Sequence, residues 1–301
     1  MRTLCFGEAI VDLICRRPVG SLADADAFVP SPGGVTANVA TAAAHHGASV
    51  SLAGGAGDDL WGAWLRDRLA AAGVDLHWFG LAPGRATAVA FVTLDDRGEP
   101  AWQLYGDGAA ATAEAVDGRL VGAVRSTDGF FFTSNTLAGK TEAQLTMEAR
   151  DQALELGRPI VFDPNIRLHR WGGNPGRAGK MAGACVPGAF LVKCNQAEAR
   201  LMTGEDEPEA AAASLLAAGA RHVIITCGVG GAILRAKGMR LDVRAQPATV
   251  LRSTVGAGDV FLGVLIARLG QSDYYPSMLA AALPEAAEEA ARACERWGAL
   301  E

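Results

Sequence analysis

The sequence has no apolar run that approaches the roughly 20 residues needed to cross a membrane. Its first residues also lack the basic-then-apolar order of a secretory signal. We therefore expect no contact with a membrane and a cytoplasmic location. Clusters of Lys and Arg are absent, and the formal net charge is −6. Because binding to a phosphate backbone requires clustered positive charge, this composition argues against nucleic acid as a partner.

Paired cysteines and spaced metal ligands are missing as well. The six cysteines, at positions 5, 15, 185, 194, 227 and 294, include no C-x-x-C pair, and the five histidines show no ligand spacing. This pattern predicts reduced, partly buried cysteines and argues against a disulfide framework or a zinc site. Together these absences favour chemistry on small molecules.

Short apolar segments rich in Val, Ile and Phe are present, and they alternate with longer segments of helical periodicity. This alternation is typical of a parallel sheet covered by helices, so the sequence predicts an α/β fold. The expected strands, each ending near Gly, Asp, Asn or Thr, are 3–7, 49–54, 129–133, 159–163, 190–194 and 222–226. Open α/β sheets bind ligands beyond the carboxyl ends of their strands, where these polar residues would lie.

Two of the expected helices carry specific predictions. Apolar residues recur at helical spacing within 58–72, so we expect Trp61 and Trp64 in the core. The spaced residues are Leu60, Trp61, Trp64, Leu65 and Leu69. Residues 141–144, Thr-Glu-Ala-Gln, have the form of a capping box that opens the next helix.

The segments 13–32 and 84–112 break this rhythm, because their apolar residues alternate with a period of two. Residues 88–94 and 101–105 flank a turn at 95–98, which predicts a β-hairpin. We expect these segments to form a small sheet that covers the active site as a β lid. Since an exposed sheet of this size needs a partner surface, a homodimer through the lid is expected.

The most informative motif is Ser-Thr-Val-Gly-Ala-Gly-Asp at 253–259, directly before an apolar run of helical character. Gly256, Ala257 and Gly258 allow a ligand to approach the backbone, and a helix start offers unpaired N–H groups to an anion. The Asp259 carboxylate could accept a proton from an attacking hydroxyl. A Gly-rich turn before Asp is also an ordinary helix start, so the motif alone leaves both interpretations open.

Five segments in order resemble the PfkB, or ribokinase-like, family of carbohydrate kinases. Residues 6–12 (FGEAIVD) and 32–38 (PGGVTAN) resemble its sugar-binding half, whereas 195–198 (NQAE), 226–231 (TCGVGG) and the Gly-Ala-Gly-Asp turn resemble its nucleotide half. The resemblance implies one domain over 1–301, built as a three-layer α/β/α sandwich with a mainly parallel central sheet and a small β lid. It also implies an ATP-dependent sugar kinase with ATP and Mg²⁺ as cofactors.

Within this family the chain is most similar to fructokinases. The similarity rests on Phe-Asp-Pro-Asn-Ile-Arg at 162–167, followed by Trp171, and on the Phe-Gly-Glu opening. It implies transfer of the ATP γ-phosphoryl group to the primary hydroxyl of fructose, giving fructose 6-phosphate. Related 2-keto-3-deoxygluconate kinases carry a similar Asp-x-Asn-x-Arg, so they are the alternative. An alternative of another class is a non-catalytic regulatory protein that binds a sugar or nucleotide.

The resemblance assigns a set of sugar contacts: Asp12, Gly33, Gly34, Asn38 and Arg167. Asp12 would accept hydrogen bonds from hydroxyls, and Asn38 would supply both a donor and an acceptor. Arg167 would orient a hydroxyl or pair with the carboxylate of a sugar acid. The structural alternatives are a turn for Asp12, a helix-end hydrogen bond for Asn38, and an Arg167 that locks a loop through Asp163.

Asp259 is implied as the catalytic base, with Gly256, Ala257 and Gly258 forming the anion cradle. The nucleotide side would comprise Asn195, Glu198, Thr226, Gly228 and Gly231. Glu198 would hold magnesium through water, which suits an ion that keeps most of its waters. The structural alternatives are a helix cap at Asn195 and a tight turn between strands at the glycines.

Two departures from the family pattern affect the expected site. Ser253 stands where many relatives have an Asp that helps to form a monovalent-cation site, which puts potassium activation in doubt. Tyr105 is followed by Gly106, where sugar-acid and fructose kinases often have Arg.

Overall fold

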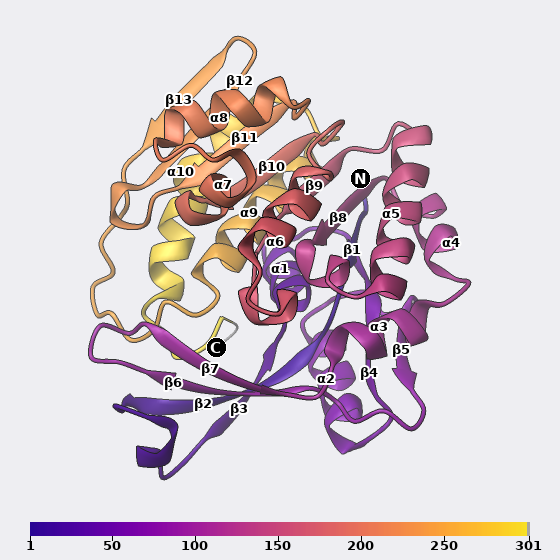
Figure 1. Ribbon diagram of the computed structural model, residues 1–301, viewed down its shortest axis with the longest axis vertical. Helices are drawn as coiled ribbons and strands as arrows, with labels where there is room; N and C mark the ends of the chain where they lie inside the picture. Colours follow the sequence, from indigo (N-terminus) through magenta and orange to yellow (C-terminus); the bar gives the residue numbers. More distant parts are fainter. Residues whose placement is uncertain (300–301) are drawn as a thin grey trace.

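The computed structural model describes residues 1–299, whose centre is a nine-stranded sheet with the order β13-β12-β11-β10-β9-β8-β1-β4-β5 (Figure 1). The strands are β1 (Thr3–Phe6), β4 (Val50–Gly57), β5 (Phe79–Ala82), β8 (Gly129–Thr133), β9 (Ile160–Asp163), β10 (Leu191–Asn195), β11 (His222–Thr226), β12 (Ala232–Ala236) and β13 (Met239–Val243). Neighbours from β5 to β11 pair in parallel, and β12 and β13 add an antiparallel edge. The six strands expected from the sequence are all present.

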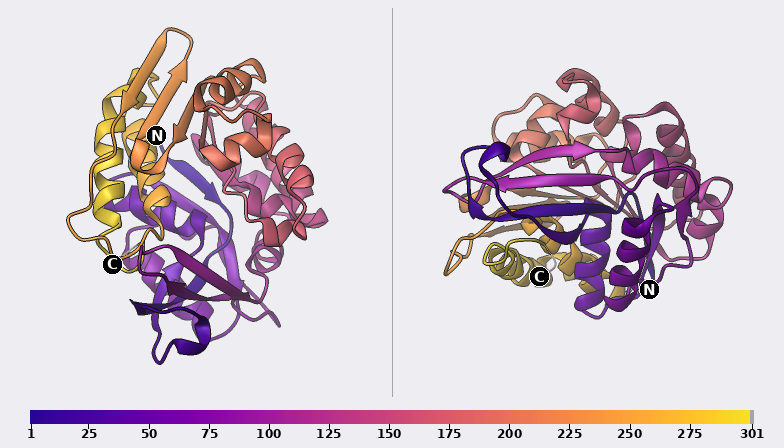
Figure 2. Two further views of the ribbon diagram at one scale, coloured as in Figure 1. Left: turned by 60° about the vertical axis from the view of Figure 1, so that its left-hand side comes forward. Right: turned by 90° about the horizontal axis from the view of Figure 1, so that it is seen from below.

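Helices cover both faces of this sheet, as the left view of Figure 2 shows. One layer contains α1 (Val35–His45), α2 (Leu60–Ala71), α9 (Ala257–Gln271) and α10 (Ser277–Ala293). The other contains α3 (Gly108–Val116), α4 (Leu120–Arg125), α5 (Lys140–Glu155), α6 (Pro175–Gly183), α7 (Gln196–Thr203) and α8 (Pro208–Ala217). Strand residues alternate between the layers: Leu4 and Phe6 pack on the second, and Cys5 packs on the first. The predicted three-layer sandwich is therefore confirmed.

A separate four-stranded sheet has the order β3-β2-β6-β7 and lies along the lower edge of the molecule in Figure 1. It comprises β2 (Ile10–Pro18), β3 (Val29–Gly33), β6 (Val89–Leu94) and β7 (Pro100–Tyr105). β6 and β7 form the predicted hairpin, whereas β2 and β6 pair in parallel. Its inner residues Ile14, Val92 and Leu94 share a small core with Val255, just ahead of α9. The small sheet is thus packed against the Gly-Ala-Gly-Asp motif.

The tryptophan prediction for the helix at 58–72 is wrong in part. The buried residues of α2 are Gly62, Leu65 and Leu69, which form one stripe along the helix. Trp61 falls outside this stripe and is exposed, and Trp64 is half-buried with its ring edge-on to Trp61 at 5.6 Å. The apolar residues between 60 and 69 surround more of the helix than the face that packs on the sheet, so some of them remain exposed.

The capping-box prediction at 141–144 is also wrong. Helix α5 begins at Lys140 with Gly139 as its N-cap, and no side chain caps it. Thr141 therefore lies inside the first turn. The residue three positions after the N-cap is Glu142, so the helix begins two residues earlier than the predicted box required.

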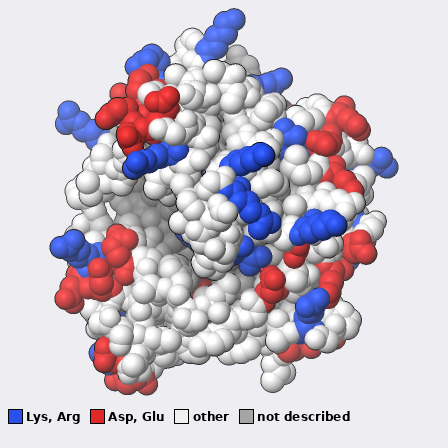
Figure 3. Space-filling view, in the orientation of Figure 1, with Lys and Arg blue, Asp and Glu red and all other residues white. Residues whose placement is uncertain are grey.

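Sequence expectations about composition can be compared with the structure. Within residues 1–299, no helix has the length and hydropathy to span a membrane. All six cysteines are free, and Cys5, Cys15, Cys185 and Cys194 are buried, as expected. On the face seen in Figure 3, basic side chains are interspersed with acidic ones.

Candidate active site

A cavity of about 420 Å³ lies at the carboxyl ends of the central strands, with the small sheet forming one wall. Most of the predicted site residues line it: Asp12, Gly34, Asn38, Arg167, Asn195, Glu198, Thr226, Gly228, Gly256, Gly258 and Asp259. Trp102 and Leu104 of β7 contribute the wall from the small sheet. Residues that are almost 250 positions apart in the sequence therefore meet at one site.

Three predicted residues do not line the cavity. A Cβ on Gly33 would collide with the Asp12 carboxyl group, so Gly33 makes room for that side chain. Gly231 has φ +90°, and a Cβ there would collide with the carbonyl oxygen of Val243. Ala257 is the first residue of α9. For Gly231 the structure therefore supports the alternative of a tight turn between strands.

The N-terminus of α9 has the backbone form that the sequence motif predicts. Gly256 is the N-cap in a left-handed conformation, with φ +74°, where a side chain would be strained and would collide with Ala299. The Asp259 N–H donates to the Gly256 carbonyl at 3.0 Å, and the Ala257 N–H lies 3.4 Å from the Thr254 carbonyl. In this conformation the cradle is therefore partly occupied by the loop's own carbonyl groups.

Asp259 is buried and accepts a hydrogen bond from a residue in the N-terminal part of the sequence. The Asn38 amide on α1 donates to Asp259 Oδ2 at 2.8 Å. Burial raises the pKa of Asp259 to about 6, against the lowering effects of the Asn38 hydrogen bond and the Lys193 charge. A carboxylate with a pKa close to neutrality is well suited to accept a proton.

Asp12 on β2 lies across the cavity from Asp259. It is 2% exposed, and its Oδ1 has no hydrogen-bond partner among the described residues. Burial, and then the charge of Asp259, raise the pKa of Asp12 to about 8, while Arg167 lowers it. A buried oxygen without a partner is costly unless a ligand supplies one, so Asp12 is built to accept a hydrogen bond from outside the protein.

Sequence reasoning missed Lys193. It lies on β10, is 5% exposed, and donates from Nζ to Asp163 Oδ2 at 2.8 Å. Asp163 Oδ1 accepts the N–H of Asn165, so both of its oxygens are engaged. Arg167 is exposed at the cavity and is not locked through Asp163, contrary to that structural alternative. The available signal was a lone Lys within an apolar strand, which implies a buried partner.

Asn195 and Glu198 form the capping box that the structural alternative describes. Asn195 Oδ1 accepts the Glu198 N–H, and Glu198 Oε2 accepts the Asn195 N–H, each at 2.9 Å. Glu198 Oε1 also accepts the N–H of Ile166 at 3.1 Å. Both residues nevertheless line the cavity. Burial and the charge of Asp163 raise the pKa of Glu198 to about 7, and Lys193 opposes that shift.

The cavity walls offer few ligands for a metal ion. Within residues 1–299, no three His, Cys, Asp or Glu side chains gather closely enough to hold a metal ion by themselves. Magnesium does not require such a cage, because it keeps several waters and takes one or two carboxylates plus phosphate oxygens. Glu198 fits that lesser role, since each of its oxygens accepts one N–H and retains a second lone pair.

Four further polar residues that line the cavity were not predicted: Glu8, Asn135, Asn165 and Arg170. Each has a buried polar atom without a hydrogen-bond partner in the described chain, namely Glu8 Oε2, Asn135 Oδ1, Asn165 Oδ1 and Arg170 Nε. They come from the segments that follow three strands, β1, β8 and β9, so no single local sequence pattern connects all of them. Only the fold brings them together.

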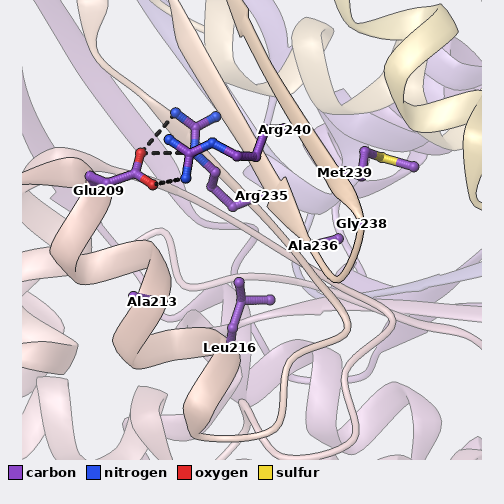
Figure 4. A pocket seen from close by; sticks show the side chains of 8 residues that line it. All are labelled: Glu209, Ala213, Leu216, Arg235, Ala236, Gly238, Met239 and Arg240. Atoms are coloured by element: carbon purple, nitrogen blue, oxygen red, sulfur yellow. Dashed lines mark hydrogen bonds and ion pairs between the residues drawn. The ribbon is translucent and has the colours of Figure 1, made fainter.

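A second hollow of similar size lies between α8 and the β12–β13 hairpin (Figure 4). Its charged groups satisfy one another: Glu209 accepts from Arg235 at 2.8 Å and from Arg240 at 2.7 Å. Arg235 also donates to the carbonyl groups of Leu234 and Leu241. This hollow is a structural feature of the sheet edge and not a candidate active site.

Comparisons with known proteins agree with the fold. The pattern of the pfkB family carbohydrate kinases matches residues 2–296. Probable fructokinase-4 of Arabidopsis thaliana is 31% identical over 265 residues, covering 88% of this chain and 81% of that protein. Fructokinase-1 of Oryza sativa subsp. japonica is 31% identical over 267 residues, covering 88% and 82%.

Solved structures are similar over the whole chain. A PfkB protein from Polaromonas sp. JS666 has a TM-score of 0.84 at 27% identity, covering 100% of this chain and 98% of that one. A double mutant of fructokinase from Vibrio cholerae O395, in a form with fructose, ADP and a potassium ion bound, has a TM-score of 0.85 at 26% identity, covering 99% and 94%. The chain therefore belongs to the pfkB family, and it is a carbohydrate kinase with a ribokinase-like fold.

Proposed function

We propose that this kinase is a fructokinase, which transfers the ATP γ-phosphoryl group to the primary hydroxyl of fructose and forms fructose 6-phosphate. The observation that carries the proposal is Asp259, a buried carboxylate at the start of α9 that faces the cavity with its pKa raised to about 6. Fructokinases that are 31% identical support the choice of sugar. The Vibrio cholerae relative binds fructose and ADP, which supports both halves of the reaction.

On the sugar side, Asp12 accepts hydrogen bonds from substrate hydroxyls through its unpartnered Oδ1. Gly33 and Gly34 keep the wall beside Asp12 free of side chains, and Asn38 presents an unpartnered Oδ1 while its amide holds Asp259. Arg167 orients a further hydroxyl. This mixture of acceptors and donors suits a polyol, whose hydroxyl groups both donate and accept.

On the phosphate side, Asp259 takes the proton of the attacking hydroxyl. The N–H groups of Ala257, Gly258 and Asp259 stabilise the charge that builds on the transferred phosphoryl oxygens, once the carbonyl groups of Thr254 and Gly256 release those of Ala257 and Asp259. Asn195, Glu198, Thr226 and Gly228 form the nucleotide side, and Gly231 makes the turn that leads into β12. Glu198 holds hydrated magnesium, and the metal supplies charge neutralisation for the ATP phosphates.

Potassium does not fit this site in the same way. Ser253 is fully buried and neutral, and its Oγ accepts the N–H of Val255 at 3.1 Å. A hydroxyl already committed to the backbone offers a monovalent cation no negative charge. We therefore propose that the kinase acts without potassium activation.

Assembly and location remain part of the proposal. The outer face of the small sheet carries an aromatic row, in which Phe91 contacts Phe28 and Tyr105 edge-on. Tyr105 is 55% exposed, and a second copy would cover it. We propose a homodimer through this lid sheet and a cytoplasmic enzyme, with light scattering on the purified protein as the test of the dimer.

The alternative substrate is 2-keto-3-deoxygluconate, which Arg167 favours because an exposed guanidinium at the cavity could pair with a carboxylate. ADP release with magnesium and ATP, measured for D-fructose, 2-keto-3-deoxygluconate and D-ribose, separates these substrates. We expect fructose to give the highest kcat/KM, and coupling to phosphoglucose isomerase should identify the product as fructose 6-phosphate. A preference for the acid or for ribose would overturn the proposal.

A further inference from the structure

The cavity contains a polar group that the reaction scheme above does not use. Glu8, Asn135 and Arg170 all line it. Glu8 is 8% exposed and Asn135 is 3% exposed, and each has a buried side-chain oxygen without a partner in the described chain. A buried, unpaired carboxylate oxygen destabilises the folded protein unless a ligand completes its hydrogen bonds.

Two glycines pack closely on Glu8. A Cβ on Gly34 would lie 2.6 Å from the Glu8 carbonyl oxygen, and a Cβ on Gly108 would lie 3.2 Å from Glu8 Cβ. Helix α3 begins at Gly108, so the base of the Glu8 side chain is packed against the N-terminus of that helix. Glu8 therefore reaches the cavity between Gly34 and the start of α3.

Arg170 supplies the opposite charge at the same place. Its side chain is 13% exposed and pairs through Nη2 with Asp107 at 3.3 Å. Asp107 is the N-cap of α3, so Arg170 spans the cavity mouth to the same helix that packs on Glu8. Arg170 Nε is buried and has no partner among the described residues. The attraction of Arg170 is also the largest charge effect on the Glu8 carboxyl.

This group lies apart from the catalytic base. Helix α3 packs on one face of the central sheet, whereas α9, which carries Asp259, packs on the other (Figure 1). Asp12 and Arg167 line the same cavity as both groups. A sugar whose reacting hydroxyl meets Asp259 would present its other end to Glu8 and Arg170.

We infer that Glu8 and Arg170, with Asn135 beside them, form a recognition subsite for the hydroxyl groups at the non-reacting end of a neutral sugar. A carboxylate only accepts hydrogen bonds and a guanidinium only donates them, so the pair matches hydroxyls that do both. For fructose phosphorylated at carbon 6, these are the hydroxyls at carbons 1 and 2. This inference rests on the proposed function and goes further by giving the reason for choosing a neutral sugar.

The subsite also acts against sugar acids. A carboxylate at this end would gain from Arg170 but would face the carboxylate of Glu8 in a site with little water, where like charges repel strongly. A substrate that lacks the hydroxyl would leave both buried groups unpaired. Sites that bind a hydroxyl in this way reject the deoxy analogue by large factors, up to about 10⁵.

The test compares kcat/KM for D-fructose and 1-deoxy-D-fructose in the wild type, Glu8→Gln and Arg170→Met. We expect the wild type to prefer fructose by about 100-fold and each variant by less than about 5-fold, because each substitution removes one of the two charged groups that pair with this hydroxyl. Glu8→Gln should also raise kcat/KM for 2-keto-3-deoxygluconate relative to fructose by about 10-fold. KM for ATP should not change in either variant.

Arg177→Met is the matched control, because Arg177 stacks on Trp171 and donates to the Ala138 carbonyl without lining the cavity. It should keep the wild-type preference for fructose over the deoxy sugar. A wild-type preference in Glu8→Gln and Arg170→Met as well would overturn the inference, even if their overall activity falls. If one variant does not fold, the other decides.

Failure of the proposed function gives a different result. In that case the wild type phosphorylates another sugar in the panel and not fructose. The same comparison is then made with that sugar and its analogue lacking the hydroxyl farthest from the phosphorylated one, and loss of discrimination in the two variants again supports the subsite. Unchanged discrimination refutes it.

Discussion

Two hollows of about 420 Å³ each lie on this molecule, and they differ in what their charged groups do. In the hollow beside α8, Glu209, Arg235 and Arg240 bind one another, so its charges need nothing from outside (Figure 4). In the cavity at the strand ends, Asp12 and Glu8 keep buried oxygens without partners. The two cavities have equal volumes, but among the described residues only one of them has buried polar atoms without hydrogen-bond partners. Unpaired buried polar atoms therefore indicate a binding site better than cavity volume does.

Among the residues that bind the sugar, Asp12 should give the largest effect when it is replaced. Asp12→Asn removes an acceptor that faces the sugar, so we expect kcat/KM for the sugar to fall by about 100-fold with KM for ATP unchanged. The pKa of Asp12 is raised from 3.8 to about 8 on folding. The folded protein therefore binds this proton more tightly than the unfolded chain, and the wild type loses stability as pH rises toward 8.

The same variant should accordingly be more stable than the wild type at pH 8 and without ligand, by on the order of 1 kcal/mol. Thermal unfolding at pH 6 and pH 8 measures this difference. If the variant instead unfolds at a lower temperature than the wild type at pH 8, the buried Asp12 carboxylate does not destabilise the free protein, and this account of Asp12 is contradicted.

The pH dependence of the rate should report Asp259. With a pKa of about 6, the base is lost as pH falls through that value, so kcat/KM for the sugar should fall about tenfold per pH unit below about 6. The charge of Asp163 also raises the pKa of Asp259, whereas the charges of Lys193 and Arg167 lower it. Rates at saturating ATP and magnesium from pH 5 to 8 provide the measurement, and a flat profile would argue against Asp259 as the base.

In the hollow beside α8, a substitution should lower stability and leave activity unchanged. Glu209→Gln weakens the pairs with Arg235, whose side chain is 7% exposed, and with Arg240 on the surface. Because Glu209 itself is 51% exposed, we expect a loss of only about 1 kcal/mol in the free energy of unfolding. Activity per folded molecule should stay at the wild-type level. Urea unfolding and a kinetic assay on one preparation test both parts.

Potassium should have the smallest effect. Since Ser253 provides no negative charge, replacing sodium by potassium at constant ionic strength should change kcat by less than about twofold. Ser253→Asp is the informative counterpart, because it restores a carboxylate at this position. Strong activation of the wild-type enzyme by potassium would show that other groups build the cation site.

The fold was predictable because its signals are local and repeated. Buried strands such as Gly129–Thr133 form continuous apolar runs, and the sheet buries them whatever lies elsewhere. The helix-cap motif at Asn195 and Glu198 was also visible, since both partners lie three residues apart. The misplaced capping box before α5 differs by a small shift in phase that pattern alone does not resolve.

The site was predictable only where a motif holds it. Asp12, Asn38 and Asp259 could be found because each lies in a short segment with glycines or small residues around it. The proximity of Glu8 to Arg170 could not, even though Glu8 lies in the same segment as Asp12, because it arises when the loops after β1 and β9 converge at one sheet edge. Residues that meet in this way have no characteristic spacing in the sequence.

The most direct test of the account is sugar-dependent ADP release by Asp259→Asn beside Glu209→Gln, each compared with the wild type. Loss of a positioned base costs about 10²–10⁴ in rate, so we expect Asp259→Asn to lose about 10³ in kcat while calorimetry shows that it still binds ATP. Glu209→Gln should keep full activity. An Asp259→Asn enzyme with more than a tenth of the wild-type kcat, or a Glu209→Gln enzyme with comparable loss, would contradict the assignment of the cavity at the strand ends as the active site.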